Sequence, residues 1–511
     1  MNFGLVIRQL GLLLMVMSAC VLSVAVWSCV QVLSGEADER MPLQALVLAV
    51  LIGGFVGGLM RYGAGRGAEP IRRREAILLV ALSWFVGAGL AALPFRIWGA
   101  LAAEAAGHPF AGFVDCYFEA MSGLTTTGAT VLTDISALPR SLLLWRAVTH
   151  WLGGLGIVLL FVAVLPMLGV GGKRLFRVEA AGPTPEGVAP RIQEAVRALW
   201  YIYLGMTVAE ILALKLVGMS WFDAVCHTFA TLATGGFSSH NASVAGYNSV
   251  GVELVILLFM VAAGINFGLY YQLLRRRWRP VLEDQELRCY LALLAIGSIV
   301  VVWSIHGMRY DITTGQEAAG DIASSVRYGV FQVVAVQTTT GFCTADFDQW
   351  GFVAKAAMLA LMFVGGSAGS TGGGLKVIRC LMAVKIMWAE IEHVFRPQVV
   401  RVVKIGRATI DNDMKLSTMV YIMGIAVLTV LGVCALMWLE RGSSIDVTTA
   451  FTASIASLNN IGPGLARVGA TCNYGWFTDG SKCVMIVLMA LGRLEVFTIV
   501  VLVFPRFWRS D

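Results

Sequence analysis

The chain has 511 residues, of which 58% are hydrophobic and only 14% are charged, and its mean hydropathy is +0.76. Because a soluble domain carries about 25% charged residues, this composition excludes an ordinary soluble protein and indicates a chain that crosses a membrane many times. The net charge of +6 is explained by basic loops on the cytoplasmic side, so it does not indicate nucleic-acid binding.

The chain begins with two apolar segments, Leu10–Leu33 and Leu43–Met60, each close to the ~20 residues that a transmembrane helix needs. The loop between them, Glu36–Arg40, is acidic, whereas the arginine cluster Arg72–Arg74 follows the second segment. Since basic loops stay in the cytoplasm, we expect the acidic loop outside and the arginine cluster inside. Residues 1–75 are therefore predicted to form a two-helix N-terminal extension.

The rest of the chain repeats one pattern four times: a long apolar helix, a short apolar helix, an extended loop and a second long helix. The short helices are too brief to span a membrane and are predicted to be re-entrant pore helices. We expect an all-α polytopic membrane protein with ten spans and four half-helices, its units sharing one orientation. The predicted units are 76–178, 179–280, 281–400 and 401–511. Their apolar segments are Ala76–Trp98, Phe113–Gly123 and Leu142–Val170; Ile192–Val217, Trp221–Leu232 and Val252–Leu274; Tyr290–His306, Val326–Val336 and the stretch from Phe352; Leu416–Leu439, Val447–Leu458 and Cys483–Val503.

Each short helix leads into four residues, here called a quartet, that end in glycine. The final glycines are spaced by about 110 residues, which is typical of a repeat architecture. Carbonyl oxygens can replace the water around a cation, and glycine tolerates the positive φ that turns a carbonyl inward. The quartets are predicted to line one cation filter; the alternative is four duplicated outer loops without a pore. They are Thr125, Thr126, Thr127 and Gly128; Ala233, Thr234, Gly235 and Gly236; Thr338, Thr339, Thr340 and Gly341; Asn459, Asn460, Ile461 and Gly462.

A glycine-rich loop interrupts the second long helix of the third unit. Such a run breaks a helix, and irregular backbone at membrane depth must line a cavity or be buried in protein. Leu375 follows it where a phosphate-binding loop would have Lys and Ser or Thr. We expect a gate below the filter, the alternative being a passive hinge or close helix packing. Its residues are Gly365, Gly366, Ser367, Ala368, Gly369, Ser370, Thr371, Gly372, Gly373 and Gly374.

Arg493 lies in the middle of the last apolar segment. A charge at that depth costs about 2.5–3.5 kcal/mol on insertion scales and is usually functional. Glu495 is a poor local partner because side chains two residues apart do not face each other on a helix, so we expect it to pair with another helix. Arg493 is predicted to project toward the ion path as part of the gate. The alternative is a structural salt bridge between helices.

Two smaller features have simpler interpretations. Asp115 and Asp223 fall at the starts of the first two short helices, where a carboxylate caps free N–H groups and suits the positive end of the helix; the alternative is a direct role in ion binding. The glycines of the stretch Gly153–Gly156 lie within an apolar helix, and small residues there are typical of close helix packing.

Six stretches between Phe118 and Phe497 resemble the Trk/Ktr/HKT superfamily of potassium transporters: FEAMSGLTTTGAT, ATGGFSSHN, TTTGFCTADF, GGSAGSTGGGLKVIR, NNIGPGL and LGRLEVF. The leading helix pair is similar to the TrkH branch. The resemblance implies four membrane–pore–membrane units around one pore, a homodimer, and a cytosolic nucleotide-binding ring, TrkA, as partner. Glycine at the end of all four quartets implies a preference for K⁺ over Na⁺. Ala233, where serine is expected, and Cys343, where threonine is common, are small departures.

The expected function is therefore potassium uptake across the cytoplasmic membrane of a bacterium. K⁺ is the transported ion and membrane lipid surrounds the protein; we expect no organic cofactor. With no nucleophile–base pair and only dispersed histidines and cysteines, the sequence does not indicate an enzyme or a metal cluster. The alternative is a sodium- or proton-coupled secondary transporter, a class that often contains broken helices. A purely structural or signalling membrane protein would leave the four quartets unexplained.

Overall fold

The computed structural model describes residues 1–64, 71–102, 109–154, 156, 192–398, 403–406, 408–410, 412–443 and 445–509. This part of the chain is mostly helical, which confirms the predicted all-α class. Two short antiparallel hairpins are its strands: β1 (Tyr310–Asp311) pairs with β2 (Glu317–Ala318), and β3 (Lys404–Ile405) pairs with β4 (Ala408–Thr409).

Among the described residues, six helices are long and apolar enough to cross a membrane. Large apolar side chains on their outer faces are exposed, for example Phe55 at 74% and Trp303 at 75%, as expected of a surface in contact with lipid. The six helices are α1 (Phe3–Leu33), α2 (Arg40–Gly63), α3 (Arg73–Leu101), α8 (Ile192–Leu216), α13 (Gln285–Ile305) and α17 (Asn412–Leu439).

The four predicted short helices are all present. Three have 12 residues and the third in chain order has 16, so each is shorter than the ~20 residues of a membrane span. They are α4 (Phe113–Leu124), α9 (Trp221–Leu232), α14 (Ile322–Gln337) and α18 (Val447–Leu458). We call them the pore helices.

Asp115 and Asp223 lie in the first turns of α4 and α9, as predicted, but neither is the capping residue. The N-cap of α9 is Ser220, whose side chain accepts a hydrogen bond from the Asp223 amide. Asp115 instead forms an ion pair with Lys482, with 2.5 Å between Oδ1 and Nζ. The carboxylates still suit the positive helix ends, and Asp115 in addition connects the first unit to the fourth.

Two second helices that were predicted to be continuous are broken. The segment Val252–Leu274 consists of α10 (Val250–Ala263) and α11 (Phe267–Leu274), which are bent by 93°. The segment Cys483–Val503 consists of α19 (Asp479–Arg493) and α20 (Phe497–Val503), separated where Glu495 and Val496 have φ of 56° and 52°. A positive φ at a β-branched residue such as Val496 is incompatible with helical continuation.

The break between α10 and α11 has a clear physical cause, because the glycine-rich loop replaces the helical hydrogen bonds. Ser367 N donates to Gly264 O at 2.9 Å, and Phe267 N donates to Gly369 O at 3.0 Å. Backbone groups at membrane depth need such partners when a helix ends. The break predicted in the third unit is observed between α15 (Phe352–Phe363) and α16 (Val377–Phe395).

The remaining elements are short or incompletely described. The first unit's second helix is described as α5 (Arg140–Gly154); the rest of the predicted segment Leu142–Val170 and the boundaries at 178/179 and 400/401 lie outside the described residues. The short helices are α12 (Trp278–Leu282), α21 (Pro505–Trp508), η1 (Ala37–Glu39), η2 (Pro109–Ala111), η4 (Ser243–Tyr247), η5 (Phe347–Gln349) and η6 (Ala466–Val468).

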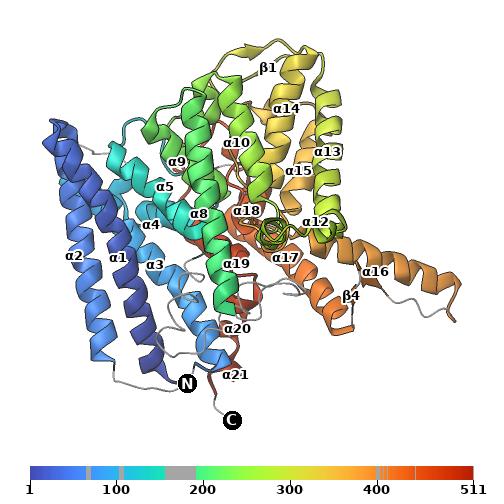
Figure 1. Ribbon diagram of the computed structural model, residues 1–511, viewed down its shortest axis with the longest axis horizontal. Coiled ribbons are helices and arrows are strands. Elements are labelled where there is room, and N and C mark those ends of the chain that lie inside the picture. Colours follow the sequence, from blue (N-terminus) through green and yellow to red (C-terminus); the bar gives the residue numbers. More distant parts are fainter. Residues whose placement is uncertain are drawn as a thin grey trace.

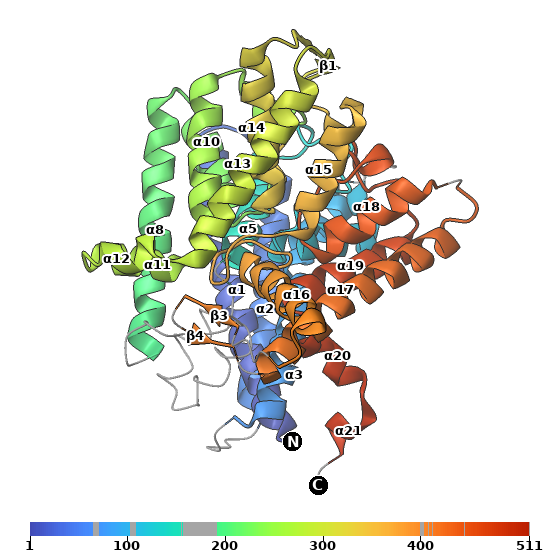
Figure 2. The same cartoon turned by 90° about the vertical axis from the view of Figure 1, so that its right-hand side faces the viewer.

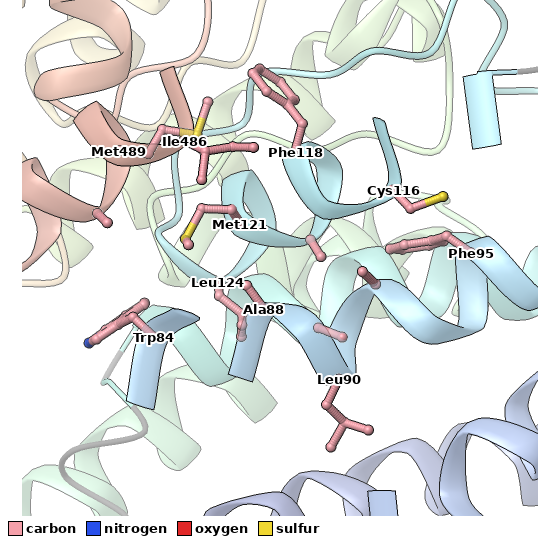
Figure 3. Close-up of a cluster of buried hydrophobic side chains, with 14 of the residues drawn as sticks. Trp84, Ala88, Leu90, Phe95, Cys116, Phe118, Met121, Leu124, Ile486 and Met489 are labelled. Atoms are coloured by element: carbon pink, nitrogen blue, oxygen red, sulfur yellow. The ribbon is translucent and has the colours of Figure 1, made fainter. Parts of the chain in front are cut away.

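The largest apolar core surrounds the first pore helix. Phe95 of α3, Met121 of α4 and Met489 of α19 are all buried in it, and Figure 3 shows these three helices side by side. The core continues into α1 and α2. The N-terminal extension therefore packs on the first unit, and the last unit closes against the same pore helix.

The two ends of the chain lie at the same end of the molecule. In Figures 1 and 2, the start of α1 and the helix α21 are at the bottom, whereas the β1–β2 hairpin is at the top. This arrangement agrees with the prediction that both termini lie on one side of the membrane; that this side is the cytoplasm stays a prediction from charge.

We expect single cysteines at Phe3 and Arg509 to resist an impermeant maleimide on intact cells, and a cysteine at Thr314 in the β1–β2 turn to react. All three positions are exposed. The background has its exposed native cysteines, Cys29, Cys434, Cys472 and Cys483, changed to alanine, and permeabilised cells are the control. Labelling of either terminal position in intact cells would contradict this topology.

Candidate ion filter and gate

The four quartets share one backbone conformation. In each, the second residue has a positive φ: 54° at Thr126, 53° at Thr234, 59° at Thr339 and 54° at Asn460. The amide of the third residue then donates to the carbonyl five residues earlier: Thr127 to Ser122 at 2.9 Å, Gly235 to Ala230 at 2.8 Å, Thr340 to Ala335 at 2.9 Å and Ile461 to Ala456 at 3.0 Å. This is a Schellman ending of the pore helix, with threonine or asparagine where glycine is usual. Threonine rarely adopts this conformation, so the surroundings must hold it.

The final glycines bring the quartets into direct backbone contact. Their φ values are 79°, 79°, 76° and 92°. A Cβ atom on Gly128 would collide with Gly235 O, one on Gly236 with Thr340 O, and one on Gly341 with Ile461 O. A Cβ on Gly462 would lie 2.7 Å from Thr127 O. The first quartet thus contacts the second, the second contacts the third, the third contacts the fourth and the fourth contacts the first. The four loops therefore close on one another.

Side chains of the quartets form hydrogen bonds that hold the loops in this conformation. Thr125 Oγ1 lies 2.7 Å from Met121 O and 2.8 Å from Thr127 Oγ1, and Thr338 repeats this pattern in the third quartet. Asn460 Nδ2 donates to Thr127 Oγ1 at 2.9 Å, which connects the fourth quartet to the first. These hydroxyl and amide groups bond to the pore helix, to the same quartet and to a neighbouring quartet. Together the bonds stabilise the backbone conformation of the loops.

The glycine-rich loop lies against the third and fourth quartets. Gly373 N donates to Thr339 Oγ1 at 2.7 Å, and a Cβ atom on Gly373 would lie 2.6 Å from Asn459 O. Lys376, which the sequence reasoning did not single out, donates from Nζ to Gly372 O at 2.6 Å. The loop and the quartets, which the sequence reasoning assigned to gate and filter, are therefore neighbours in the fold.

Arg493 connects three segments that are distant in the sequence. Its guanidinium donates to Thr371 O at 2.9 Å and to Gly154 O at 2.9 Å, and it also donates to Gly153 O. Glu495 pairs with Arg379 of α16, with 2.6 Å between Oε2 and Nη2, so the expected partner on another helix is confirmed. Arg493 itself contacts carbonyl oxygens of the loop and of α5.

The glycines of α5 do pack closely, as predicted, and they have a second role. A Cβ atom on Gly154 would lie 2.8 Å from Ala233 Cα, so a larger residue would push α5 away from the second quartet. Their carbonyls also accept from Arg493, which composition alone could not indicate. Leu155, in the middle of the predicted stretch, lies outside the described residues.

Buried charges around the site were missed at the sequence level. Glu286 of α13 accepts hydrogen bonds at Oε1 from Ala368 N at 2.7 Å and from Ile378 N at 3.1 Å, so it holds the glycine-rich loop to the start of α16. Arg146 of α5 pairs with Glu119 of α4 at 2.7 Å. The usable signal was a charged residue within an apolar segment, which is rarely placed there without a role.

The chemistry available at the site is that of backbone oxygen. In the described part of the chain, no group of three or more His, Cys, Asp and Glu side chains could hold a metal ion. The non-glycine quartet residues are fully buried, and the four loops meet through carbonyl groups. Carbonyl and hydroxyl oxygens without a fixed charge suit a cation that must bind and leave again.

Comparisons with known proteins agree with this geometry. The family model described as TrkH, a cation transport protein, matches residues 58–510. The chain is 37% identical to the Trk system potassium uptake protein TrkH of Halomonas elongata and 35% identical to that of Escherichia coli K12, with all of each chain covered. The crystal structure of the potassium transporter TrkH from Vibrio parahaemolyticus superposes with a TM-score of 0.84 at 32% identity, again over all of both chains. The chain thus belongs to the TrkH family of cation transport proteins and is a multi-pass protein of the bacterial cytoplasmic membrane.

Proposed function

We propose that this protein takes up potassium through a single pore formed by four pseudo-symmetric membrane–pore–membrane units, 76–178, 179–280, 281–400 and 401–511, with residues 1–75 as two leading helices. The observation that carries the proposal is the closed order of contacts among Gly128, Gly236, Gly341 and Gly462. Relatives of the same length are named potassium uptake proteins, which supports K⁺ as the ion.

In this proposal the quartets replace the hydration shell of K⁺ with backbone carbonyls. The second residue and the final glycine of each quartet both have a positive φ, which lets carbonyl groups turn toward a common axis. The ion is the substrate, and the protein needs no organic cofactor and acts as a transporter, without enzymatic chemistry. The sixteen quartet residues named above are the proposed ion-binding residues.

The glycine-rich loop Gly365–Gly374 and Arg493 form the proposed gate. The loop is anchored to the third quartet through Gly373 and to α13 through Glu286. Arg493 donates to the loop at Thr371, so its positive charge lies beside the segment that must move. A fixed positive charge at membrane depth raises the energy of a passing cation. Flux would then require the loop and Arg493 to shift together.

Partner subunits are a further part of the proposal. The relatives are named as components of a Trk system, and the resemblance noted from the sequence implies a homodimer and a cytosolic nucleotide-binding ring of the TrkA type. Helix α16 projects away from the body of the protein (Figure 1). Its Arg379–Glu495 pair would connect movements of this helix to the end of α19.

A sodium- or proton-coupled transporter is the second candidate, because broken helices at membrane depth are typical of that class. Two of the second helices are broken beside the glycine-rich loop, between α10 and α11 and between α15 and α16. Flux of K⁺, Rb⁺, Na⁺ and Li⁺ into liposomes that contain the purified protein separates the candidates. Uniport predicts K⁺ flux without any Na⁺ or H⁺ gradient; a strict requirement for such a gradient would favour coupling.

Gly128→Ser should lower the ratio of K⁺ to Na⁺ flux by about tenfold, a change of about 1.4 kcal/mol between the two barriers. The physical reason is that Gly128 has φ of 79° and its Cβ position is occupied by Gly235 O. Gly58→Ser is the matched control, because its Cβ meets nothing within 4 Å. An unchanged ratio in folded Gly128→Ser would contradict a filter at this quartet.

Arg493→Ala should increase K⁺ flux by about tenfold, because it removes a positive charge beside the ion path. Arg493→Lys should change flux less, since the charge remains. Flux is compared at equal amounts of folded protein, measured by size-exclusion chromatography. A decrease in flux for Arg493→Ala at normal folding would mean that its bonds to Gly153, Gly154 and Thr371 are purely structural.

Deletion of Ala368–Gly373 should raise K⁺ flux in liposomes that lack any cytosolic partner. The deletion removes the Gly373–Thr339 and Ala368–Glu286 hydrogen bonds that hold the loop in place. Removal of Thr314, which is exposed in the β1–β2 turn, is a control for a deletion elsewhere in the third unit. Equal flux from the unmodified protein and the folded loop deletion would leave the loop as a passive hinge.

A further inference from the structure

One position on each pore helix lies nine residues before the final glycine of its quartet, and on three of the helices its side chain contacts the chain that follows the quartet. It is occupied by Glu119, His227, Gln332 and Ala453. Glu119 Oε2 accepts from Val131 N at 3.0 Å, His227 Nε2 lies 3.0 Å from Ser238 Oγ, and Gln332 Nε2 donates to Ala345 O at 2.8 Å. Three of the four pore helices therefore hold the outgoing chain through this side chain, and the first does so with a formal charge.

That charge is neutralised by a buried arginine. Arg146 Nε donates to Glu119 Oε1 at 2.8 Å, and the two side chains are 1% and 0% exposed. Thr130 Oγ1, two residues after Gly128, donates to the same carboxylate at 2.9 Å. The ion pair is thus built into the wall of the first quartet.

Arg146 also reaches the second quartet. Its Nη1 donates to Ser238 O at 3.2 Å, and its guanidinium lies 4.0 Å from the centre of the Phe237 ring. Phe237 and Ser238 follow Gly236 directly. Since an arginine can both donate in a fixed plane and stack on an aromatic face, one side chain connects the outgoing chains of two neighbouring quartets.

His150, one helical turn after Arg146, makes a second connection between the same two units. Its Nδ1 lies 2.8 Å from Gly123 O at the end of the first pore helix, and its Nε2 accepts from Phe237 N at 3.2 Å. Only the neutral imidazole with hydrogen on Nδ1 satisfies both bonds. A Cβ atom on Gly235 would lie 2.5 Å from the imidazole ring, so the ring lies directly behind the second quartet.

The fourth unit holds its quartet without these polar groups. Gly153 of α5 and Gly492 of α19 are equivalent, because a Cβ on either would collide with the last carbonyl of its own pore helix, Leu124 O or Leu458 O. This alignment places Met485 where the first unit has Arg146, and Met489 where it has His150. With Ala453 in place of Glu119, the neighbouring Thr452 holds the outgoing chain instead: its Oγ1 accepts from Leu465 N at 3.1 Å and lies 3.3 Å from Leu465 O. A unit of this fold can therefore be built without a charged pair at these positions.

We propose that Glu119, Arg146 and His150 are positioning residues for ion selectivity, which fix the separation between the first and second quartets. The inference rests on the proposed function and deepens it. A buried ion pair often contributes little net stability and can instead specify one arrangement. Here it joins the two outgoing chains whose quartets meet at Gly128 and Gly235, so its loss should widen the range of ions that the carbonyls accommodate.

The fourth unit supplies the variants for the test. Glu119→Ala combined with Arg146→Met copies Ala453 and Met485, and it removes both charges together, so neither is left buried without a partner. His150→Met copies Met489. We expect each variant to fold and to conduct K⁺, while the ratio of K⁺ to Na⁺ flux in liposomes falls by about tenfold, equivalent to about 1.4 kcal/mol between the two barriers.

The control removes a second, partly buried arginine–glutamate pair, whose side chains are 27% and 5% exposed. Arg327 Nε and Glu253 Oε2 lie 2.7 Å apart, but Arg327 is near the start of α14, at the opposite end of that helix from Thr338. Glu253→Ala with Arg327→Met should leave the ratio of K⁺ to Na⁺ flux unchanged. If this ratio falls as far as it does in the Glu119→Ala/Arg146→Met variant, the inference is overturned. Loss of any ion pair would then lower selectivity, whatever its position.

Three further outcomes test the positioning role. An unchanged ratio in folded Glu119→Ala/Arg146→Met and in folded His150→Met overturns the positioning role and leaves the proposed function intact. Equal K⁺ and Na⁺ flux in the unmodified protein overturns both. If the double variant does not fold, Arg146→Lys decides: it keeps the charge beside Glu119 and loses the planar contact with Phe237 and Ser238, so an unchanged ratio there overturns the inference.

Discussion

Close backbone contact between four loops is the constraint on which the rest of this structure depends. Each final glycine of a quartet has its Cα against a carbonyl of the next quartet, so no side chain fits at these four places. The residue two positions earlier adopts a left-handed conformation that threonine and asparagine resist. Strain of this kind persists only when the surroundings determine it from several sides. The pore helices, the Thr125 and Thr338 hydroxyls and the cross-link from Asn460 to Thr127 all serve this purpose.

The second constraint is the cost of unpaired backbone groups at membrane depth. A helix that ends inside the membrane exposes carbonyl and amide groups that lipid cannot satisfy. Here the ends of α10 and α11 are satisfied by the glycine-rich loop, and the loop in turn is satisfied by Thr339, Glu286 and Arg493. The irregular segments therefore lie together because each provides the other's hydrogen bonds, and a change in one must be accompanied by a change in the others.

The sequence predicted those features that local chemistry determines. The short helices, the glycine that ends each quartet and the break at Gly365–Gly374 all follow from residue types within a few positions. The break after Gly264 and the one at Glu495 could not be predicted in the same way, because both occur in apolar stretches that lack a glycine run and depend on partners distant in the chain. The Glu119–Arg146 pair was hidden for a related reason: each charge lies alone in its own segment, and only the fold brings the two together.

One hydrogen bond has a consequence for biogenesis. Asn460 Nδ2 binds Thr127 Oγ1 across 333 residues of sequence, and Gly462 makes its close approach to the carbonyl of that same threonine. Contacts of such long range form late, because the intervening chain must first be synthesised and inserted. The first three quartets can therefore be in the membrane while one side of the first still lacks its neighbour. The four loops can therefore close on one another only after the last unit has been inserted.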